Sequence, residues 1–249
     1  MGSDQLVLVI GGSRGTGLLI AQRLMRDGVA VRVLARNPTE ARARLGPSCE
    51  IVAGDLTQPE TLPRPIEGIT HVVFTAGRRS GRPTSEKNIR ETEYVGVVNT
   101  LEAAREVGFN GRFLYMTSSG STSRSLFAWA LNVYKGNTLR WRRRAEDAIR
   151  DSTLDYTIIR AGVLLNRPGG QHAIRITQES LPLSLRYRIA RADVAETFVA
   201  AMSHPRASRS TFDAVWGKGP RRENLSALLD GLEPDAIPTA SPPAHLEDE

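Results

Sequence analysis

The residues best suited to chemistry are three glycines near the N-terminus, Gly11, Gly15 and Gly17. Glycine adopts the positive φ angles that a sharp turn requires, and its missing side chain lets a ligand approach the backbone closely. Backbone N–H groups and the dipole at a helix start bind phosphate. Ser13 and Thr16 add hydroxyl groups to this turn. We expect the turn to hold a diphosphate; the alternative is a helix-entry turn without a ligand.

The elements that must position this turn are a strand, a helix and a second strand. Residues 6–10 form an uninterrupted apolar run, which predicts a strand covered on both faces. Apolar residues at helical spacing over 18–24 predict a helix, and residues 30–35 predict the next strand. Arg36 follows it, where an acidic residue would bind a ribose 2′-hydroxyl group. Together with Arg14 it suits a 2′-phosphate, so the sequence favours NADP(H) over NAD(H).

Composition narrows the class of protein. The 249 residues, 40% hydrophobic and 24% charged, are typical of a soluble globular domain. A single cysteine, Cys49, excludes a disulfide framework, and four scattered histidines give no metal-ligand spacing, so we expect no metal. No membrane span or leader is evident, and we expect a cytoplasmic protein. The net charge of +6 is spread along the chain, and acidic small molecules explain it more simply than nucleic acid.

Strands alternate with helices along the chain, which predicts an α/β fold with a doubly wound parallel sheet (Rossmann) in a single domain. Further strands are expected at 51–53, 71–75, 112–117, 155–160 and 211–215, and helices at 85–107, 137–151 and 194–202. Residues 183–189 alternate apolar and polar side chains, which predicts a strand with one wet face. The domain should span 1–232, with a small substrate-covering elaboration at about 163–190. Residues 233–249, rich in Pro, Ala and acid, should form a mobile tail.

A family resemblance rests on the glycine turn and on later segments in the same order. The turn reads Gly11-xxx-Gly15-x-Gly17 rather than GxGxxG. The later segments are 94–99, 101–104, 113–119, 141–146, 155–162 and 192–195. The series resembles the atypical short-chain dehydrogenases/reductases of the NmrA-like, NAD(P)-binding group, and it covers about residues 6–202.

The resemblance implies where a cofactor would lie. The glycine turn would hold the diphosphate, with Arg14 and Arg36 at the 2′-phosphate. Asp55 would hydrogen-bond the adenine and Leu56 would pack against it, although Asp55 could instead be a turn residue. The positions implied for the ribose and the nicotinamide are Thr75, Ala76, Gly77, Thr117, Ala161, Gly162 and Val163.

The residues at the catalytic positions differ from those of the family. Its Tyr-xxx-Lys pair, which protonates a carbonyl substrate, occurs nowhere in this sequence. Arg144 falls on the lysine position, where it could bind a ribose but would keep its proton. Ser118 matches the residue that holds the carbonyl oxygen, or it caps the following loop. Tyr134, beside Lys135, remains as a proton donor, but neighbouring residues on a helix point apart.

The function implied is an NADPH-dependent reductase of a ketone or quinone, such as an aromatic or polyketide-like one, whose delocalised oxyanion needs little from an acid. A non-catalytic NADP(H)-binding redox sensor with a protein partner would equally lack the pair. An epimerase or isomerase with transient cofactor use is a third reading. The sequence also contains two arginine clusters, each of which could be a solvated surface or could bind a ligand. They are Arg78, Arg79 and Arg82, and Arg140, Arg142, Arg143 and Arg144.

Overall fold

An eight-stranded sheet runs through the centre of the molecule in the order β3-β2-β1-β4-β5-β6-β10-β8. The structure, a computed structural model, describes residues 5–77, 85–120, 137–221 and 224–236. All neighbouring strands of this sheet are parallel except β10 and β8. In sheet order the strands are β3 (Glu50–Ala53), β2 (Ala30–Ala35), β1 (Leu6–Ile10), β4 (His71–Phe74), β5 (Arg112–Ser118), β6 (Asp155–Ala161), β10 (Ser210–Trp216) and β8 (Ile174–Thr177).

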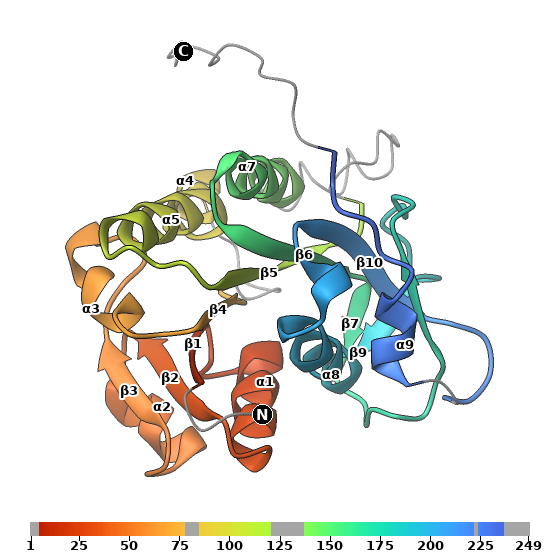
Figure 1. Ribbon diagram of the computed structural model, residues 1–249, viewed down its shortest axis with the longest axis horizontal. Helices are drawn as coiled ribbons and strands as arrows, with labels where there is room; N and C mark the ends of the chain where they lie inside the picture. The colour runs from red at the N-terminus through yellow and green to blue at the C-terminus, as the bar shows by residue number, and fades with distance from the viewer. Residues whose placement is uncertain (1–4, 78–84, 121–136, 222–223, 237–249) are drawn as a thin grey trace.

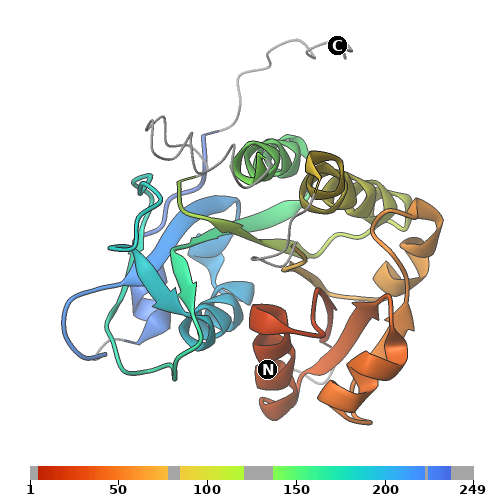
Figure 2. The ribbon, with the colours of Figure 1, turned by 180° about the vertical axis from the view of Figure 1, so that it is seen from behind.

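Helices cover both faces of the sheet, which confirms the predicted fold class (Figure 1). One face packs against α1 (Gly15–Arg26), α2 (Pro38–Leu45), α8 (Arg191–Met202) and α9 (Leu225–Leu229). The other packs against α3 (Pro63–Ile66), α5 (Gly96–Glu106) and α7 (Thr138–Asp151). The view from behind in Figure 2 shows the same two layers.

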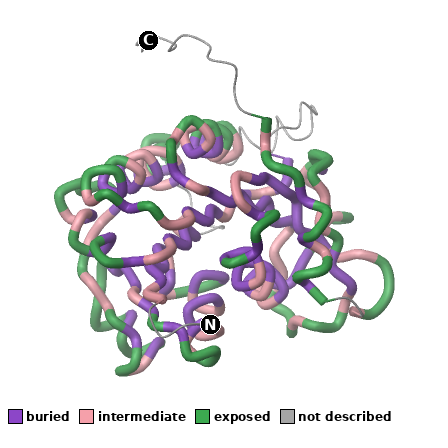
Figure 3. Tube along the Cα trace, in the orientation of Figure 1, coloured by how far each residue is buried: buried purple, intermediate pink, exposed green. Residues whose placement is uncertain are grey.

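The uninterrupted apolar run of β1 follows from this two-sided cover. Val7 and Val9 lie in the core beneath α1 and α8, while Leu8 and Ile10 lie in the core beneath α3 and α5. Successive side chains of a strand point to opposite faces, so a strand between two helical layers needs apolar residues at every position. The buried residues accordingly follow the strands and the inner sides of the helices (Figure 3).

The helix expected over 85–107 is divided into three parts. It consists of α4 (Glu86–Arg90), a π-helical turn η2 (Glu91–Val95) and α5. A π turn inserts an extra residue and rotates the side chains that follow it. One consequence is that Glu93 of this turn is buried, with 3% of its surface exposed.

The strand expected over 183–189 is wrong for most of its length. Only β9 (Arg188–Ala190) is extended there, and it pairs with β7 (Val163–Leu165) in a separate two-stranded sheet. Residues 184–187 form a turn in which the Tyr187 N–H donates to the Ser184 carbonyl, and Leu185 is 76% exposed. The alternation of side chains over 183–189 therefore reflected a turn. The strand that joins the main sheet is β8, whose four residues Ile174 to Thr177 also alternate but were not predicted as a strand.

The tail expected from residue 233 begins with residues that are fastened to the sheet. The Glu233 N–H donates to the side chain of Gln178. The Asp235 carboxylate accepts hydrogen bonds from the Thr211 backbone and hydroxyl and from the Tyr156 hydroxyl. The segment up to residue 236 thus belongs to the folded part, and the rest of the expected tail lies outside the described residues. Within the described ranges, no helix is both long and apolar enough to cross a membrane.

Candidate functional site

The glycine turn connects β1 to α1 and packs directly against the end of β4. A Cβ atom on Gly11, whose φ is +85°, would lie 2.7 Å from the Ala76 nitrogen. A Cβ on Gly17 would overlap the Thr75 hydroxyl and the Gly11 carbonyl oxygen. The Thr75 hydroxyl donates to the Ile10 carbonyl at 3.0 Å, which fastens the two strand ends together. Glycine is therefore required at both positions for the turn to approach β4.

The start of α1 leaves backbone and hydroxyl groups without partners. Arg14 occupies the N-cap in an extended conformation without a capping side chain, and the first turn of α1 contains no acidic residue. A Cβ built on Gly15, whose φ is +57°, would meet nothing within 4 Å. The Thr16 hydroxyl is buried and has no hydrogen-bond partner, and half-buried Ser13 precedes the helix. An anion such as a diphosphate fits these groups, because the helix start offers N–H donors and open space.

Two exposed arginines flank this helix start. Arg14 lies beyond β1, and its guanidinium reaches the Gly77 carbonyl at 3.5 Å. Arg36 lies beyond β2, the parallel neighbour of β1, so both are at the same edge of the sheet. In the described part of the chain, neither takes part in an ion pair. Both guanidiniums are therefore available to a phosphate.

Asp55 and Leu56 have structural contacts of their own. One carboxylate oxygen of Asp55 accepts hydrogen bonds from the backbone and hydroxyl of Thr57, at 3.0 and 2.9 Å. This is the turn role that the sequence left open for Asp55. Leu56 is only 9% exposed and packs over Gly96, and its carbonyl accepts from the Asn99 side chain at 2.7 Å. Their contacts with an adenine remain predictions.

A buried ion pair that the sequence did not single out lies beside the end of β4. Arg142 of α7 binds Glu93 through two nitrogens, at 2.9 and 3.3 Å. A Cβ on Gly77 would come within 3.1 Å of Glu93 and 3.4 Å of Arg142, so half-buried Ala76 and Gly77 leave little room there. Burial alone would lower the pKa of Arg142, but the Glu93 carboxylate raises it, and the net pKa is raised. Arg142 therefore keeps its charge at the site.

Arg144, expected at the lysine position, is not the arginine that faces the sheet. Residues on an α-helix are separated by about 100°, so Arg142 and Arg144 point to different sides of α7. The structure turns Arg142 toward Glu93, whereas Arg144 is exposed, with its guanidinium carbon 5.1 Å from the centre of the Trp141 ring. Within the described residues, Arg142 rather than Arg144 lies beside Gly77 at the end of β4, and a contact between Arg144 and a ribose remains a prediction.

Hydroxyl groups gather at the end of β5. The Thr117 hydroxyl is buried near the Tyr115 phenol, and neither hydroxyl has a hydrogen bond of normal geometry. The half-buried Ser118 hydroxyl donates to the Ser119 carbonyl at 3.1 Å. Tyr115 lies two residues before Thr117, on the same face of β5. Burial, together with Glu93, raises the pKa of its phenol far above the ordinary value. Tyr115 is thus a neutral phenol and a poor acid. Tyr134 lies outside the described residues.

Beyond β6 the chain closes the same edge. Ala161 and Gly162 are buried, and Val163 is half-buried. The Gly162 N–H donates to the Ala214 carbonyl at 3.1 Å, and the Val163 N–H donates to the Tyr187 carbonyl at 2.8 Å. These bonds place the three residues next to β10 and the turn before β9. A nicotinamide contact at Val163 remains a prediction.

Asp213 of β10 is an unusual buried carboxyl group behind this edge. It is 1% exposed, and neither of its oxygens has a hydrogen bond of normal geometry. Its neighbour across the sheet, Arg160, is already bound to Glu146 of α7 at 2.5 Å. Burial raises the pKa of Asp213 to about 6, although Ser119 and Arg160 lie near enough to oppose the rise. The sequence gave no signal for this, because it depends on which strands become neighbours.

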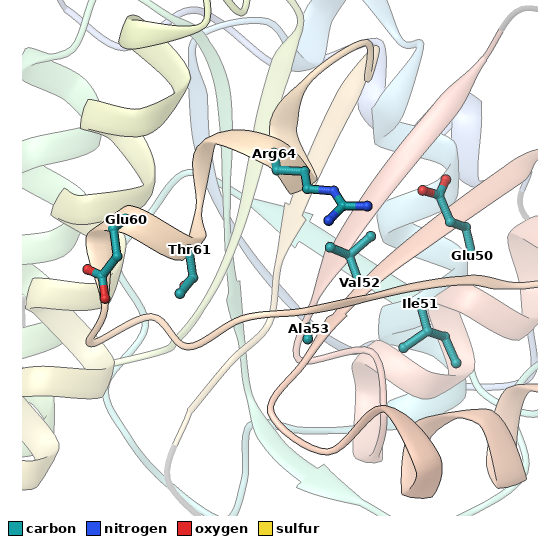
Figure 4. Close-up of a pocket in the computed structure, with 7 residues that line it drawn as sticks. All are labelled: Glu50, Ile51, Val52, Ala53, Glu60, Thr61 and Arg64. Atoms are coloured by element: carbon teal, nitrogen blue, oxygen red, sulfur yellow. The ribbon is translucent and has the colours of Figure 1, made fainter.

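A separate hollow lies beside β3 (Figure 4). It measures about 370 Å³ and is lined by Glu50, Ile51, Val52, Ala53, Glu60, Thr61 and Arg64. These residues belong to β3, the outermost strand, and to the segment around α3. None of the residues of the glycine turn or of the β5 end lines it, so it is not the candidate site.

Groups suited to metal or thiol chemistry are not evident in the part of the chain that the structure describes. No cluster of three or more His, Cys, Asp or Glu side chains there is arranged to hold a metal ion. Cys49 is buried, and desolvation raises its pKa to about 11, so it stays a thiol at neutral pH. The chemistry available at the edge is therefore that of phosphate binding and hydroxyl donors.

Comparisons with known proteins agree with this geometry. A family model described as NAD(P)H-binding matches residues 11–205. Sanguinarine reductase from Eschscholzia californica is 31% identical over 85% of this chain and 89% of its own. The uncharacterized sugar epimerase YhfK from Bacillus subtilis is 28% identical over 80% of this chain and 88% of its own. The solved oxidoreductase ylbE from Lactococcus lactis superposes with a TM-score of 0.74 at 18% identity, covering 92% of this chain and 96% of that one, which is a likeness of fold.

Proposed function

We propose, from the premise that this chain belongs to the NAD(P)H-binding family of atypical short-chain dehydrogenases/reductases, that it is an NADPH-dependent reductase of a ketone or quinone carbonyl. Membership and its reductase relative make it an NAD(P)-dependent oxidoreductase. The choice of NADPH and of a carbonyl substrate is our proposal. One relative is named for the reduction of sanguinarine, which supports reduction as the direction.

The preference for NADPH is supported by Arg14 and Arg36. Both are exposed beside the open start of α1, and in the described residues neither is neutralised by a carboxylate. A guanidinium matches a phosphate through paired N–H donors, whereas a ribose hydroxyl needs an acceptor such as Asp. No acid follows β2 directly, since Arg36 and Asn37 occupy those positions.

The observation that carries the proposal is a row of unpartnered groups along one edge of the sheet. The uncapped start of α1 and the Thr16 hydroxyl offer donors for a diphosphate. The Thr117 hydroxyl, with Ser118 beside it, offers donors farther along the same edge, at the end of β5. A buried polar group without a partner costs free energy, so such a row is expected where a polar ligand binds.

The residues of this chain would position and polarise the substrate. When bound, NADPH would supply the hydride for the carbonyl carbon. The Ser118 hydroxyl would turn from the Ser119 carbonyl and donate to the developing oxyanion, while Arg142, held by Glu93, would bind a ribose hydroxyl. A proton from water, or from Tyr134, would complete the alcohol. A donor aimed at an oxyanion lowers the barrier by about 3–4 kcal/mol, which suits a substrate whose oxyanion is already delocalised.

The test is NADPH consumption with a panel of quinones and aromatic ketones. We expect turnover with at least one, and the variant Ser118→Ala should lower kcat about 100-fold or more with little change in KM. NADPH binding without turnover of any carbonyl would contradict the reductase reading and leave cofactor binding intact.

A redox sensor is the second candidate, favoured by the missing Tyr-xxx-Lys pair. Calorimetry with NADPH and with NADP⁺ tests it. A sensor needs different affinities for the two forms, and a partner whose binding changes with them. Equal affinities would leave it no signal to transmit.

An epimerase is the third candidate, and the relative named as a sugar epimerase favours it. Such an enzyme would convert its substrate without net oxidation of the cofactor. Product analysis by chromatography with catalytic amounts of NADP⁺ distinguishes it from a reductase, which needs one NADPH for each carbonyl reduced and would form no alcohol from NADP⁺ alone.

A further inference from the structure

Four exposed arginines on α4 and α7 form one basic surface, which we call the arginine face. They are Arg90 near the end of α4 and Arg140, Arg143 and Arg144 on the first half of α7. The two helices lie side by side on the outer layer of the molecule (Figure 1). The face is distinct from the cofactor edge, since Arg142 of the same helix turns inward to Glu93.

Three of these arginines converge on a single indole ring. The guanidinium carbons of Arg90, Arg140 and Arg144 lie 5.7, 5.4 and 5.1 Å from the centre of the Trp141 ring. Trp141 is only 7% exposed and is fixed by a hydrogen bond from its ring nitrogen to Glu86. Cation–π contacts of this kind restrain flexible side chains. The three guanidiniums are therefore held close together before any partner arrives.

This arrangement costs the isolated protein free energy. In the described part of the chain, none of the four arginines forms an ion pair. Arg140 and Arg144 stand four residues apart on α7, where like charges repel by about 0.2–0.5 kcal/mol. Positive charge near a helix start also opposes the helix dipole, and the first turn of α7 contains no acid. An anionic partner would relieve both costs.

We propose that the arginine face docks an acidic polypeptide helix. Arg140 and Arg144 stand one turn apart on α7, so their Cβ atoms have the same spacing, about 5–6 Å, as two acidic residues at positions i and i+4 of a facing helix. Each guanidinium can bind a carboxylate through two N–H donors. Arg90, across Trp141 on α4, adds a third contact from the neighbouring helix.

Nucleic acid fits this face less well. Trp141 is buried beneath the arginines, so its ring is not available to stack on a base. Exposed acids also border the face: Glu86 on α4, and Asp147 and Asp151 on α7. They would repel a continuous phosphate backbone, whereas a helix that carries its carboxylates on one side can place uncharged side chains against them. A second copy of the chain would bring arginines against arginines.

The experiment uses the full chain and a fluorescent alanine-rich helical peptide with Glu at every fourth position. Binding is followed by anisotropy at low and at physiological salt. The double variant Arg140→Gln/Arg144→Gln should weaken peptide binding about 10-fold or more, because two bidentate pairs are lost. The matched control, Arg105→Gln/Arg206→Gln, removes two exposed arginines elsewhere and should weaken binding less than about 3-fold.

Several outcomes would overturn the proposal. Equal weakening by both double variants would show attraction to net charge alone, and failure of the parent protein to bind the peptide at low salt would remove the premise. Tighter binding of duplex DNA than of the peptide, lost in the face variant, would assign the face to nucleic acid. Conversion of a dimer to a monomer by that variant would assign it to a second copy. Far-UV circular dichroism and thermal melting of each variant, measured in parallel, report folding, and a failed reductase assay would not affect these readings.

Discussion

Arg36 illustrates how one side chain at the sheet edge can select between two dinucleotides. Replacing it with Ala should weaken NADPH binding about 10-fold or more, because a charge-assisted hydrogen bond is worth about 1.5–3 kcal/mol. NADH binding should change little, since it carries no 2′-phosphate. Fluorescence titration with both cofactors measures the effect, and Arg26→Ala, an exposed arginine on the outer part of α1, is the control. An equal loss for NADH would show that Arg36 supports the fold instead.

Asp213 should make stability depend on pH. Burial raises its pKa from 3.8 to about 6, so the folded state holds this proton more tightly than the unfolded chain does. The free energy of unfolding therefore falls as pH rises from about 4 through about 6. Above this window it is lower by about 3 kcal/mol, because each pKa unit corresponds to about 1.4 kcal/mol. The variant Asp213→Asn cannot ionise and should gain stability over the parent protein as pH rises.

Urea denaturation at about pH 4, about pH 5.5 and about pH 7 measures that difference. The control is Asp151→Asn, since Asp151 is exposed at the end of α7. A constant difference between Asp213→Asn and the parent protein across the three pH values would contradict the raised pKa.

Residues that act locally could be found from the sequence, and residues that act through the fold could not. The glycine turn was predictable because positive φ and close backbone approach need glycine wherever they occur. The inward position of Arg142 was not predictable, because the rotation of α7 about its axis is set by Ala145 and Ile149, which pack on the sheet. The burial and raised pKa of Asp213 were not predictable either, because its surroundings come from α7, β5 and β6 together.

The turn between β1 and α1 allows binding and stability to be separated. Gly15→Ala places a methyl group in the open space before the helix start, so it should abolish NADPH binding. The alanine at this position would also have to adopt a positive φ, which should lower the free energy of unfolding by about 1–2 kcal/mol. Gly17→Ala should impair both properties, because the added Cβ overlaps Thr75 and Gly11. Thermal melting with and without NADPH checks both variants. Retained binding in Gly15→Ala would show that the diphosphate lies elsewhere.

At the scale of elements, long apolar patterns were predicted well and irregular ones were not. Strands β1, β2, β4, β5, β6 and β10 were each found within a residue or two of their bounds. The π turn of Glu91–Val95 has no sequence signature, because any helix-forming stretch can accommodate it. The alternation near residue 185 misled because a turn can also expose every second side chain. Packing against Gly120 and β7, rather than local preference, decided that segment.

The last described segment should contribute to the stability of the whole molecule. A chain that ends after Leu232 lacks the Asp235 carboxylate, which leaves Tyr156, Thr211 and Arg150 without that partner. We expect it to be less stable by about 2 kcal/mol or more than a chain that ends after Ala236. Urea denaturation compares the two chains. Equal stability would show that water replaces Asp235 without cost.

For the whole molecule, the class of fold followed from the alternation of strands and helices, but the order of strands did not. The pairings of β1 with β2, β2 with β3, β4 with β5 and β5 with β6 could be inferred, because consecutive strands of a βαβ unit usually become neighbours. The insertion of β10 between β6 and β8 could not, since β8 precedes β10 in the chain and was not recognised as a strand. Antiparallel pairing of β8 with β10 is a long-range contact that no local pattern encodes.

This interior position of β10 has a consequence for synthesis on the ribosome. A nascent chain that has released β6 and β8 still lacks the strand that joins them, so both edges stay unsatisfied until residues 210–216 emerge. Unpaired strand edges invite association between chains. Polypeptides stalled before residue 210 should therefore be protease-sensitive and prone to aggregate, and chaperones should engage this protein late in translation.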